Sequence, residues 1–196
     1  KQLASCLSQK LAVGDVVGFI ASNTPELYEA HFGVPMAGMV LNAINYRLDA
    51  QTIAYIIDHS DIKMLFVDTE FLSLAEKAVN LAKKKPNIII IKDEQTFTFE
   101  ESYTQMDYEE FLVSHDLGTD YYKPLDEWEN LSINYTSGTT GNPKGVVYHH
   151  RGAYLNAMGN ALEWDMKMHP TYLWTLPMFH CNGWCFPWTI AMRAGT

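Results

Sequence analysis

The stretch "KMLFVDTEFLSLAEKAVNLAKKKPNIIIIK", residues 63–92, decides the fold class. Its two ends, residues 63–68 and 87–92, are short apolar runs with the length and composition of buried strands. The segment between them has the periodicity of a helix, and we expect Lys83, Lys84 and Lys85 to cap its C-terminus. A strand, a helix and a second strand in this order predict a crossover between two parallel strands.

The same alternation continues toward the start of the chain. We expect a strand over residues 14–22, then a helix with Thr24 as its N-cap and Pro25 at its first position. An extended run over residues 40–46 and a helix over 49–60 follow. The fold class is therefore α/β, with an open, mostly parallel sheet flanked by helices.

Three sections follow from this reading: a first α/β section over residues 1–92, a connecting region over 93–130 and a last section over 131–196. The connecting region is acidic and aromatic, and we expect Asp107 to open a short helix there, with a small strand pair nearby. The last section predicts two strands around a polar loop, a helix over 151–166 and a strand over 171–176.

Composition excludes several classes of function. Acidic residues outnumber basic ones by 23 to 14, and the net charge of −9 argues against a nucleic-acid partner. No apolar run approaches the roughly 20 residues that cross a bilayer. The first residue is Lys1, the segment after it lacks the apolar block of a signal peptide, and Cys6, Cys181 and Cys185 cannot all pair. We therefore expect a cytoplasmic protein, present here as a piece that begins inside a helix.

The polar loop between residues 135 and 146 is the strongest functional feature. Its glycines, Gly138, Gly141 and Gly145, leave backbone N–H groups open to an anion, and Lys144 adds a positive charge. The spacing differs from a Walker loop, and a strand rather than a helix follows it. An ordinary polar hairpin tip is the alternative, although ten such residues in a row favour phosphate binding.

The quoted residues carry a resemblance to a known family. The loop "YTSGTTGNPKGV" resembles the phosphate-binding motif of the adenylate-forming (AMP-binding) acyl-CoA synthetases, and the similarity extends through residues 14–48, 56–68, 149–156 and 176–184. The resemblance implies that ATP activates a carboxylic acid to an acyl-adenylate, which then forms a thioester with CoA, with Mg²⁺ as the metal ion. Catalysis would rest on charge neutralisation and positioning, with Lys144 as a catalytic residue. The positions that match the family's ATP-binding loop are Thr136, Ser137, Gly138, Thr139, Thr140, Gly141 and Lys144.

A second segment, "LPMFHCNGWCFPW" at residues 176–188, places His180 just after a predicted strand. The resemblance assigns His180 to the border of the acyl and α-phosphate sites, as a catalytic and substrate-proximal residue, and Trp184 to the acyl tunnel. A hydrogen-bonded structural role for His180 and a core role for Trp184 are the alternatives. Cys181 and Cys185 lack a second ligand pair at zinc-finger spacing, so we expect no metal held by these residues.

The same segment narrows the substrate class. Amino-acid adenylating domains tend to carry an Asp after the Phe, whereas His180 follows Phe179 here, which favours a plain carboxylic acid, fatty or related. The sequence of this segment most resembles those of medium-chain fatty-acid and methylthiopropionate-type CoA ligases. Family members continue well beyond Thr196, so we expect the chain to be the N-terminal part of such a ligase, inactive alone.

Two other functions stay open from the sequence. One is an amino-acid or aryl-acid adenylating domain that loads a carrier protein. The other is a non-catalytic α/β fragment that only binds a partner. The expected partners of the first reading are a small-molecule acid, ATP and CoA, and the sequence leaves the oligomeric state undecided.

Overall fold

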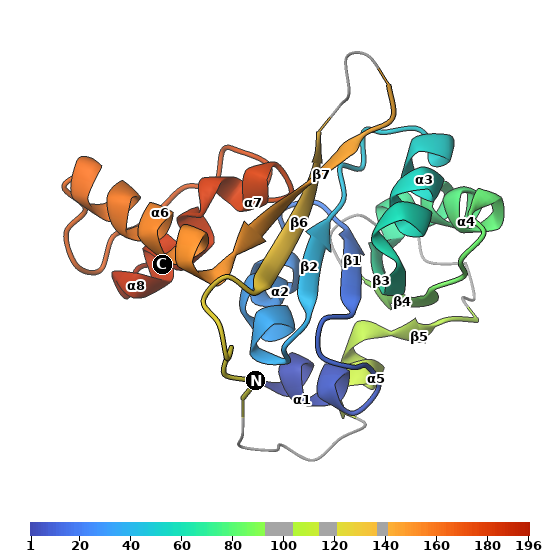
Figure 1. Cartoon of the computed structure of the whole chain (residues 1–196), viewed down its shortest axis with the longest axis horizontal. Helices are drawn as coiled ribbons and strands as arrows, with labels where there is room; N and C mark the ends of the chain where they lie inside the picture. The colour runs from blue at the N-terminus through green and yellow to red at the C-terminus, as the bar shows by residue number, and fades with distance from the viewer. Residues whose placement is uncertain (93–103, 114–120, 137–140) are drawn as a thin grey trace.

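Seven strands form one sheet in the computed structural model, which describes residues 1–92, 104–113, 121–136 and 141–196 (Figure 1). Their spatial order is β5–β4–β3–β1–β2–β6–β7. Every pair of neighbours is parallel except β6 and β7, which are antiparallel. The predicted open, mostly parallel α/β sheet is confirmed. The strands are β1 (Val16–Ile20), β2 (Val40–Ala43), β3 (Ile62–Asp68), β4 (Asn87–Ile91), β5 (Met106–Asp107), β6 (Asn130–Thr136) and β7 (Lys144–His149).

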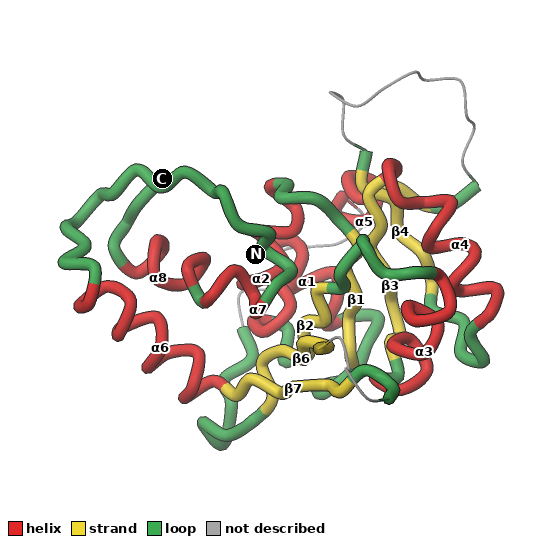
Figure 2. Tube along the Cα trace, turned by 90° about the horizontal axis from the view of Figure 1, so that it is seen from above, coloured by secondary structure: helices red, strands yellow, loops and turns green. Residues whose placement is uncertain are grey.

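Helices cover both faces of the sheet, because successive side chains of a strand point to opposite faces (Figure 2). On one face Phe19 of β1 stacks on Phe66 of β3, with ring centroids 4.6 Å apart. On the other face Leu65 and Val67 are fully buried in a second core cluster. The first face packs against α1 (Gln2–Ser8), α2 (Pro25–Met36) and α5 (Tyr108–Val113), and the second against α3 (Ala50–Ser60) and α4 (Leu72–Leu81), which follows a short 3-10 helix (Thr69–Phe71).

The predicted N-cap at Thr24 is present, and of the three lysines expected to cap α4 only Lys85 is seen to do so among the described contacts. The hydroxyl of Thr24 accepts a hydrogen bond from the Leu27 N–H at 3.4 Å, and the Asp49 carboxylate accepts one from the Thr52 N–H at 2.8 Å. At the end of α4, the Lys85 ammonium donates to three main-chain carbonyls at 2.5–3.0 Å. These carbonyls have no partner within the helix, so the lysine satisfies them and opposes the negative end of the helix dipole.

The end of the chain forms a separate group of helices beside the β6–β7 hairpin, on the far side of it from α3 and α4 (Figure 1). These helices are α6 (His150–Glu163), the short turn α7 (Cys181–Trp184) and α8 (Phe186–Met192). His149 begins α6, since its Nδ1 accepts a hydrogen bond from the Gly152 N–H at 2.9 Å. The chain therefore turns from the last strand directly into a helix.

One expectation about local structure is wrong. Residues 171–176 form no strand: the N–H of Tyr172 donates to Thr196 and the N–H of Thr196 to Pro170, at 2.7 and 2.8 Å. The segment thus runs beside the end of the chain instead of joining the sheet. Two hydrogen bonds are too few to form the ladder of a β-strand pair. In the connecting region, β5 adds to β4, and most of the segment where a small strand pair was expected lies outside the described residues. Asp107 does open α5, since it accepts from the Glu110 N–H at 2.8 Å.

A buried histidine joins the first helical layer to the last one. His31 of α2 is fully buried, and its Nδ1 lies 2.7 Å from the Leu27 carbonyl oxygen. The indole of Trp188 in α8 donates to the His31 main-chain carbonyl at 3.0 Å, and its ring packs edge-on against the imidazole. Burial lowers the pKa of His31 to about 4, because the charged form would lose its hydration.

We predict that replacing Phe66 by Ala lowers the free energy of unfolding by about 3–5 kcal/mol, because the cavity left in the core cannot close fully. Leu125→Ala is the matched control, since Leu125 is 95% exposed and its loss costs less than about 0.5 kcal/mol. Urea unfolding followed by circular dichroism measures both values. Equal losses in the two variants would contradict the placement of Phe66 in the core.

We also predict that His31 makes the protein less stable in acid. In the unfolded chain His31 binds a proton at its ordinary pKa of about 6.5, whereas in the folded chain its pKa is about 4. The free energy of unfolding therefore falls as the pH drops from about 6.5 to about 4, by about 3 kcal/mol in total. Urea unfolding across this range measures the fall. His31→Gln lowers overall stability and flattens this part of the profile; an unchanged slope would contradict the assignment.

Candidate active site

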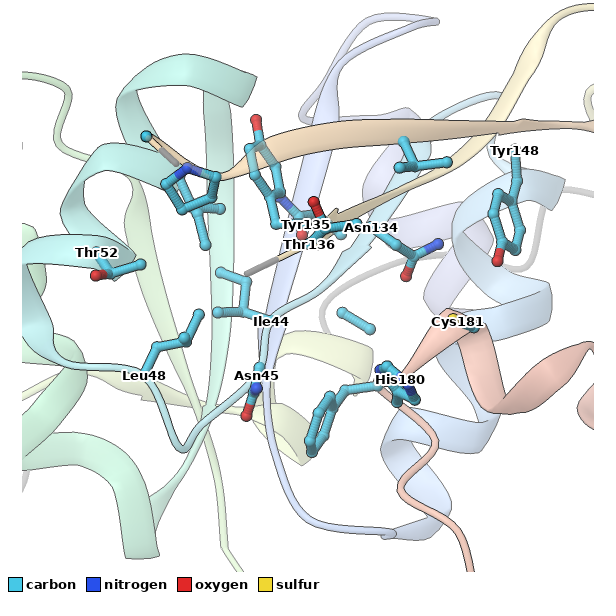
Figure 3. A pocket seen from close by; sticks show the side chains of 17 residues that line it. Ile44, Asn45, Leu48, Thr52, Asn134, Tyr135, Thr136, Tyr148, His180 and Cys181 are labelled. Atoms are coloured by element: carbon cyan, nitrogen blue, oxygen red, sulfur yellow. The ribbon is translucent and has the colours of Figure 1, made fainter. Parts of the chain in front are cut away.

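A cavity of about 420 Å³ lies where the C-terminal ends of β2 and β6 meet the start of α3 and the turn α7 (Figure 3). Ligands of open α/β sheets bind at this edge, beyond the carboxyl ends of the strands. The segment from β2 to α3 contributes Asn45 and Thr52, and the β6–β7 hairpin contributes Asn134. Phe179 and His180 close the opposite side.

The β6–β7 hairpin brings the two described ends of the predicted phosphate loop to this cavity. Thr136, the last residue of β6, pairs with Lys144, the first residue of β7. Thr136 and Gly141 line the cavity, whereas Lys144 is exposed where the loop enters β7 and is not among the lining residues. The expected strands on either side of the loop are confirmed, and a strand rather than a helix follows it. The other predicted loop residues, Ser137, Gly138, Thr139 and Thr140, lie outside the described residues.

Two contacts hold the end of the hairpin next to the loop. The Tyr135 hydroxyl lies 2.6 Å from Nδ1 of His59, which ties β6 to α3. Gly145 faces Tyr135 across the hairpin, and a Cβ built on it would lie 2.7 Å from Cδ1 of Ile133. Gly145 therefore leaves room for neighbouring side chains. The sequence had suggested that it keeps an N–H free for an anion, but its place within β7 favours the packing role.

His180 reaches the cavity through a clamp that the sequence did not reveal. The Nδ2 of Asn23, just after β1, donates to the Leu176 carbonyl at 2.9 Å, and its Oδ1 accepts from the Met178 N–H at 2.8 Å. The extended segment before His180 is thus held to the sheet without being a strand of it. His180 is exposed and lies at the start of α7, lining the cavity.

The turn after His180 has an unusual backbone. All five residues from 181 to 185 have φ between 45° and 64°, in the left-handed region, and only Gly183 among them is a glycine. A left-handed conformation costs an L-residue roughly 1–2 kcal/mol, so the surroundings must hold this turn in place. Gly183 lies close under Trp174, where a Cβ would meet the ring at 3.0 Å.

Trp184 lies outside the main cavity. It lines a second cavity of about 380 Å³ between β7, α6 and α7, together with Val147 and Asn156. Tyr148 and Cys181 line both cavities and thus form the partition between them. Burial, and next the neighbouring thiol of Cys181, raise the pKa of Tyr148 to about 12, so its hydroxyl stays neutral. The sequence analysis did not identify Tyr148. The alternation of side chains between the two sides of β7 was the signal that could have indicated it.

The chemistry of the two cavities suits an anionic ligand. Among the described residues that line them, none is Asp or Glu, and the polar groups are amides, hydroxyls, imidazoles and main-chain groups. Hydroxyls and main-chain N–H groups can donate to phosphate or carboxylate oxygens. Within the part of the chain that the structure describes, no group of three His, Cys, Asp or Glu side chains could hold a metal ion by itself.

Comparisons with known proteins agree with this geometry. A family model described as AMP-binding enzyme matches residues 1–196. The chain is 46% identical to the peroxisomal acetate/butyrate–CoA ligase AAE7 of Arabidopsis thaliana, over all of this chain and 37% of that protein. It is also 46% identical to the peroxisomal trans-cinnamate:CoA ligase of Petunia hybrida, again over all of this chain and 37% of the relative. The chain thus spans well under half the length of these relatives.

Solved structures show the same fold. The N-terminal domain of FACL13 from Mycobacterium tuberculosis superposes with a TM-score of 0.78 at 27% identity, covering all of this chain and 47% of that one. A fatty acyl CoA synthetase of the same organism gives a TM-score of 0.79 at 26% identity, covering all of this chain and 36% of the other.

The comparisons contradict the expected cytoplasmic location, because the names of several relatives place them in the peroxisome. Cysteine content and composition could not decide this, since a peroxisomal address is a short signal read by a receptor. None of the helices in the described ranges is long and apolar enough to cross a membrane. With its fold, its hairpin loop and the match over residues 1–196, the chain belongs to the family of AMP-binding enzymes.

Proposed function

We propose that the protein carrying this chain is an acid–CoA ligase. It would join a carboxylate to the α-phosphate of ATP, release pyrophosphate, and then transfer the acyl group from the adenylate to the thiol of CoA with release of AMP. The observation that carries the proposal is the hairpin loop at the rim of a cavity lined by Thr136, Gly141 and His180, in a chain of the AMP-binding family.

The residues of this chain would act mainly by neutralising and positioning charge. Two anions must approach each other in the first step, so hydrogen-bond donors aimed at the phosphates lower the barrier. We assign this role to the loop from Thr136 to Gly141, with Lys144 supplying a mobile positive charge from the start of β7, next to the loop. His180, which lines the same cavity, would contact the acyl group and the α-phosphate. Mg²⁺, when bound, would share the neutralisation of the triphosphate.

We propose a short aliphatic or aryl-substituted acid as the substrate. The names of the relatives assign acetate, butyrate and cinnamate to them, and the neighbouring cavity next to Trp184 offers mostly apolar and aromatic surface for an acyl group. The described lining of both cavities has no carboxylate to pair with a substrate ammonium, which disfavours an amino acid. By the same relatives, we propose a peroxisomal location.

We predict that Lys144→Ala weakens ATP binding to the full-length protein about tenfold, because one charge-assisted contact to phosphate is lost. Isothermal titration with ATP and Mg²⁺ measures the affinity. Lys167→Ala is the matched control, since Lys167 is an exposed lysine that pairs with Asp165 beyond α6. Equal heats from the wild type and the Lys144 variant would favour the reading of the chain as a non-catalytic binding fragment.

We further predict that the full-length protein exchanges pyrophosphate into ATP when butyrate or cinnamate is added, and that the 196-residue chain does not. The physical reason is that the chain covers 37% of the relatives' length, so much of the relatives' structure lies outside it. Radiolabelled pyrophosphate measures the exchange. Activity with amino acids but with neither carboxylic acid would support the alternative, an adenylating domain that loads a carrier.

A further inference from the structure

The left-handed turn after His180 is held by one buried side chain. Asn182 has no exposed surface, and its Oδ1 accepts two hydrogen bonds. The hydroxyl of Ser132 donates at 2.7 Å and the amide of Asn134 at 2.5 Å. Both donors are themselves buried, at 0% and 7% exposure. We call Ser132, Asn134 and Asn182 the amide network.

The amide network connects the two parts of the candidate site. Ser132 and Asn134 belong to β6 and precede Thr136, where the phosphate loop begins, by four and two residues. Asn182 follows His180 by two residues. Figure 3 shows Asn134 on the hairpin, with Cys181 and His180 on the facing turn. The strand that carries the loop and the turn that carries His180 are therefore fastened to each other by side chains.

The residue type and the backbone conformation at position 182 both favour a role for Asn182 beyond filling space in the turn. Asparagine is one of the few residues that accept the left-handed region, and its φ of 45° and ψ of 53° fall there. The Nδ2 of Asn182 and the Oδ1 of Asn134 have no hydrogen-bond partner among the described residues. A buried polar group without a partner is unfavourable, so glycine, which accepts this backbone without burying an amide, would suit a purely structural turn better.

We propose that Asn182 is a positioning residue, which sets His180 relative to β6, the strand that leads into the phosphate loop, through the amide network. This inference rests on the proposed function. Asn182 need not touch a substrate itself. Through two hydrogen bonds to β6 it would fix the turn, and the turn would fix the imidazole at the cavity wall. A displacement of about 1 Å of a reacting group can reduce a rate about a hundredfold, so such a clamp has a measurable effect.

The test is a double-mutant cycle in the full-length protein, with Asn182→Gly and His180→Ala. Glycine accepts the left-handed backbone, so the first variant removes the amide while keeping the turn accessible. We expect Asn182→Gly and His180→Ala each to lower the kcat of acid-dependent ATP–pyrophosphate exchange by at least about thirtyfold. The KM for ATP should stay within about threefold of the wild-type value, because loop contacts are kept. The double variant should be no slower than His180→Ala alone.

Two further variants make the result specific. Ser132→Ala removes one donor and leaves the backbone of the turn unchanged, and we expect an intermediate loss of kcat. Asn160→Ala is the matched control: its amide donates to the Trp184 carbonyl at 2.9 Å, at the end of the same turn but outside the amide network. We expect its kcat to remain within about threefold of wild type. Circular dichroism and thermal melting check that each variant is folded.

Several outcomes overturn the inference. If the losses of Asn182→Gly and His180→Ala multiply in the double variant, the two residues act independently. If His180→Ala leaves kcat unchanged, there is nothing for Asn182 to position. If neither Asn182→Gly nor Ser132→Ala folds, the amide network is structural only. These outcomes leave the proposed function intact, whereas a wild-type protein without exchange for any carboxylic acid overturns the function and this inference together.

Discussion

The pairing of β6 with β2 is the constraint on which the candidate site depends. Leu41 of β2 and Ser132 of β6 are in register, so β6 runs parallel to β2 and ends at the same edge of the sheet. Because of this direction, the loop after Thr136 and the segment after β2 meet at one place. An antiparallel β6 would carry the loop to the opposite edge, away from His180. The main-chain ladder therefore determines which distant parts of the sequence share the cavity.

Beyond the sheet, the site is held by amide side chains rather than by ion pairs. Asn23 clamps the segment before His180, and Asn182 clamps the turn after it. An amide both donates and accepts, and it carries no charge that would have to be desolvated. Among the described residues, the ion pairs lie at the surface, as with Lys167 and Asp165, where solvent weakens them. Because these amides carry no charge, they do not compete with an anionic ligand for the positive charge near the loop.

The sequence predicted the fold well because its signals there are local. The apolar run around Phe66, the cap at Thr24 and the lysine at the end of α4 each depend on a few neighbouring residues. The strand expected over residues 171–176 failed for the opposite reason. Its composition suits a strand, but a strand needs a partner, and this segment lies beside the end of the chain instead.

The candidate site was predicted only in part. The loop and His180 stand out by residue type and by resemblance, and the structure places Thr136, Gly141 and His180 around one cavity. Asn182 and Tyr148 could not be found in this way, since their contacts join residues about 50 or more positions apart or depend on which side of a strand faces inward. Trp184, expected at the acyl tunnel, lines the neighbouring cavity, and its role stays a prediction.

A crystal structure of the full-length protein with ATP, Mg²⁺ and an unreactive analogue of the acid tests the central claim most directly. The account predicts that main-chain N–H groups and hydroxyls of the loop after β6 contact the β- and γ-phosphates. It also predicts that the Lys144 ammonium approaches them and that His180 lies beside the α-phosphate and the acid. A nucleotide bound elsewhere, with the loop after β6 free of phosphate, would contradict it.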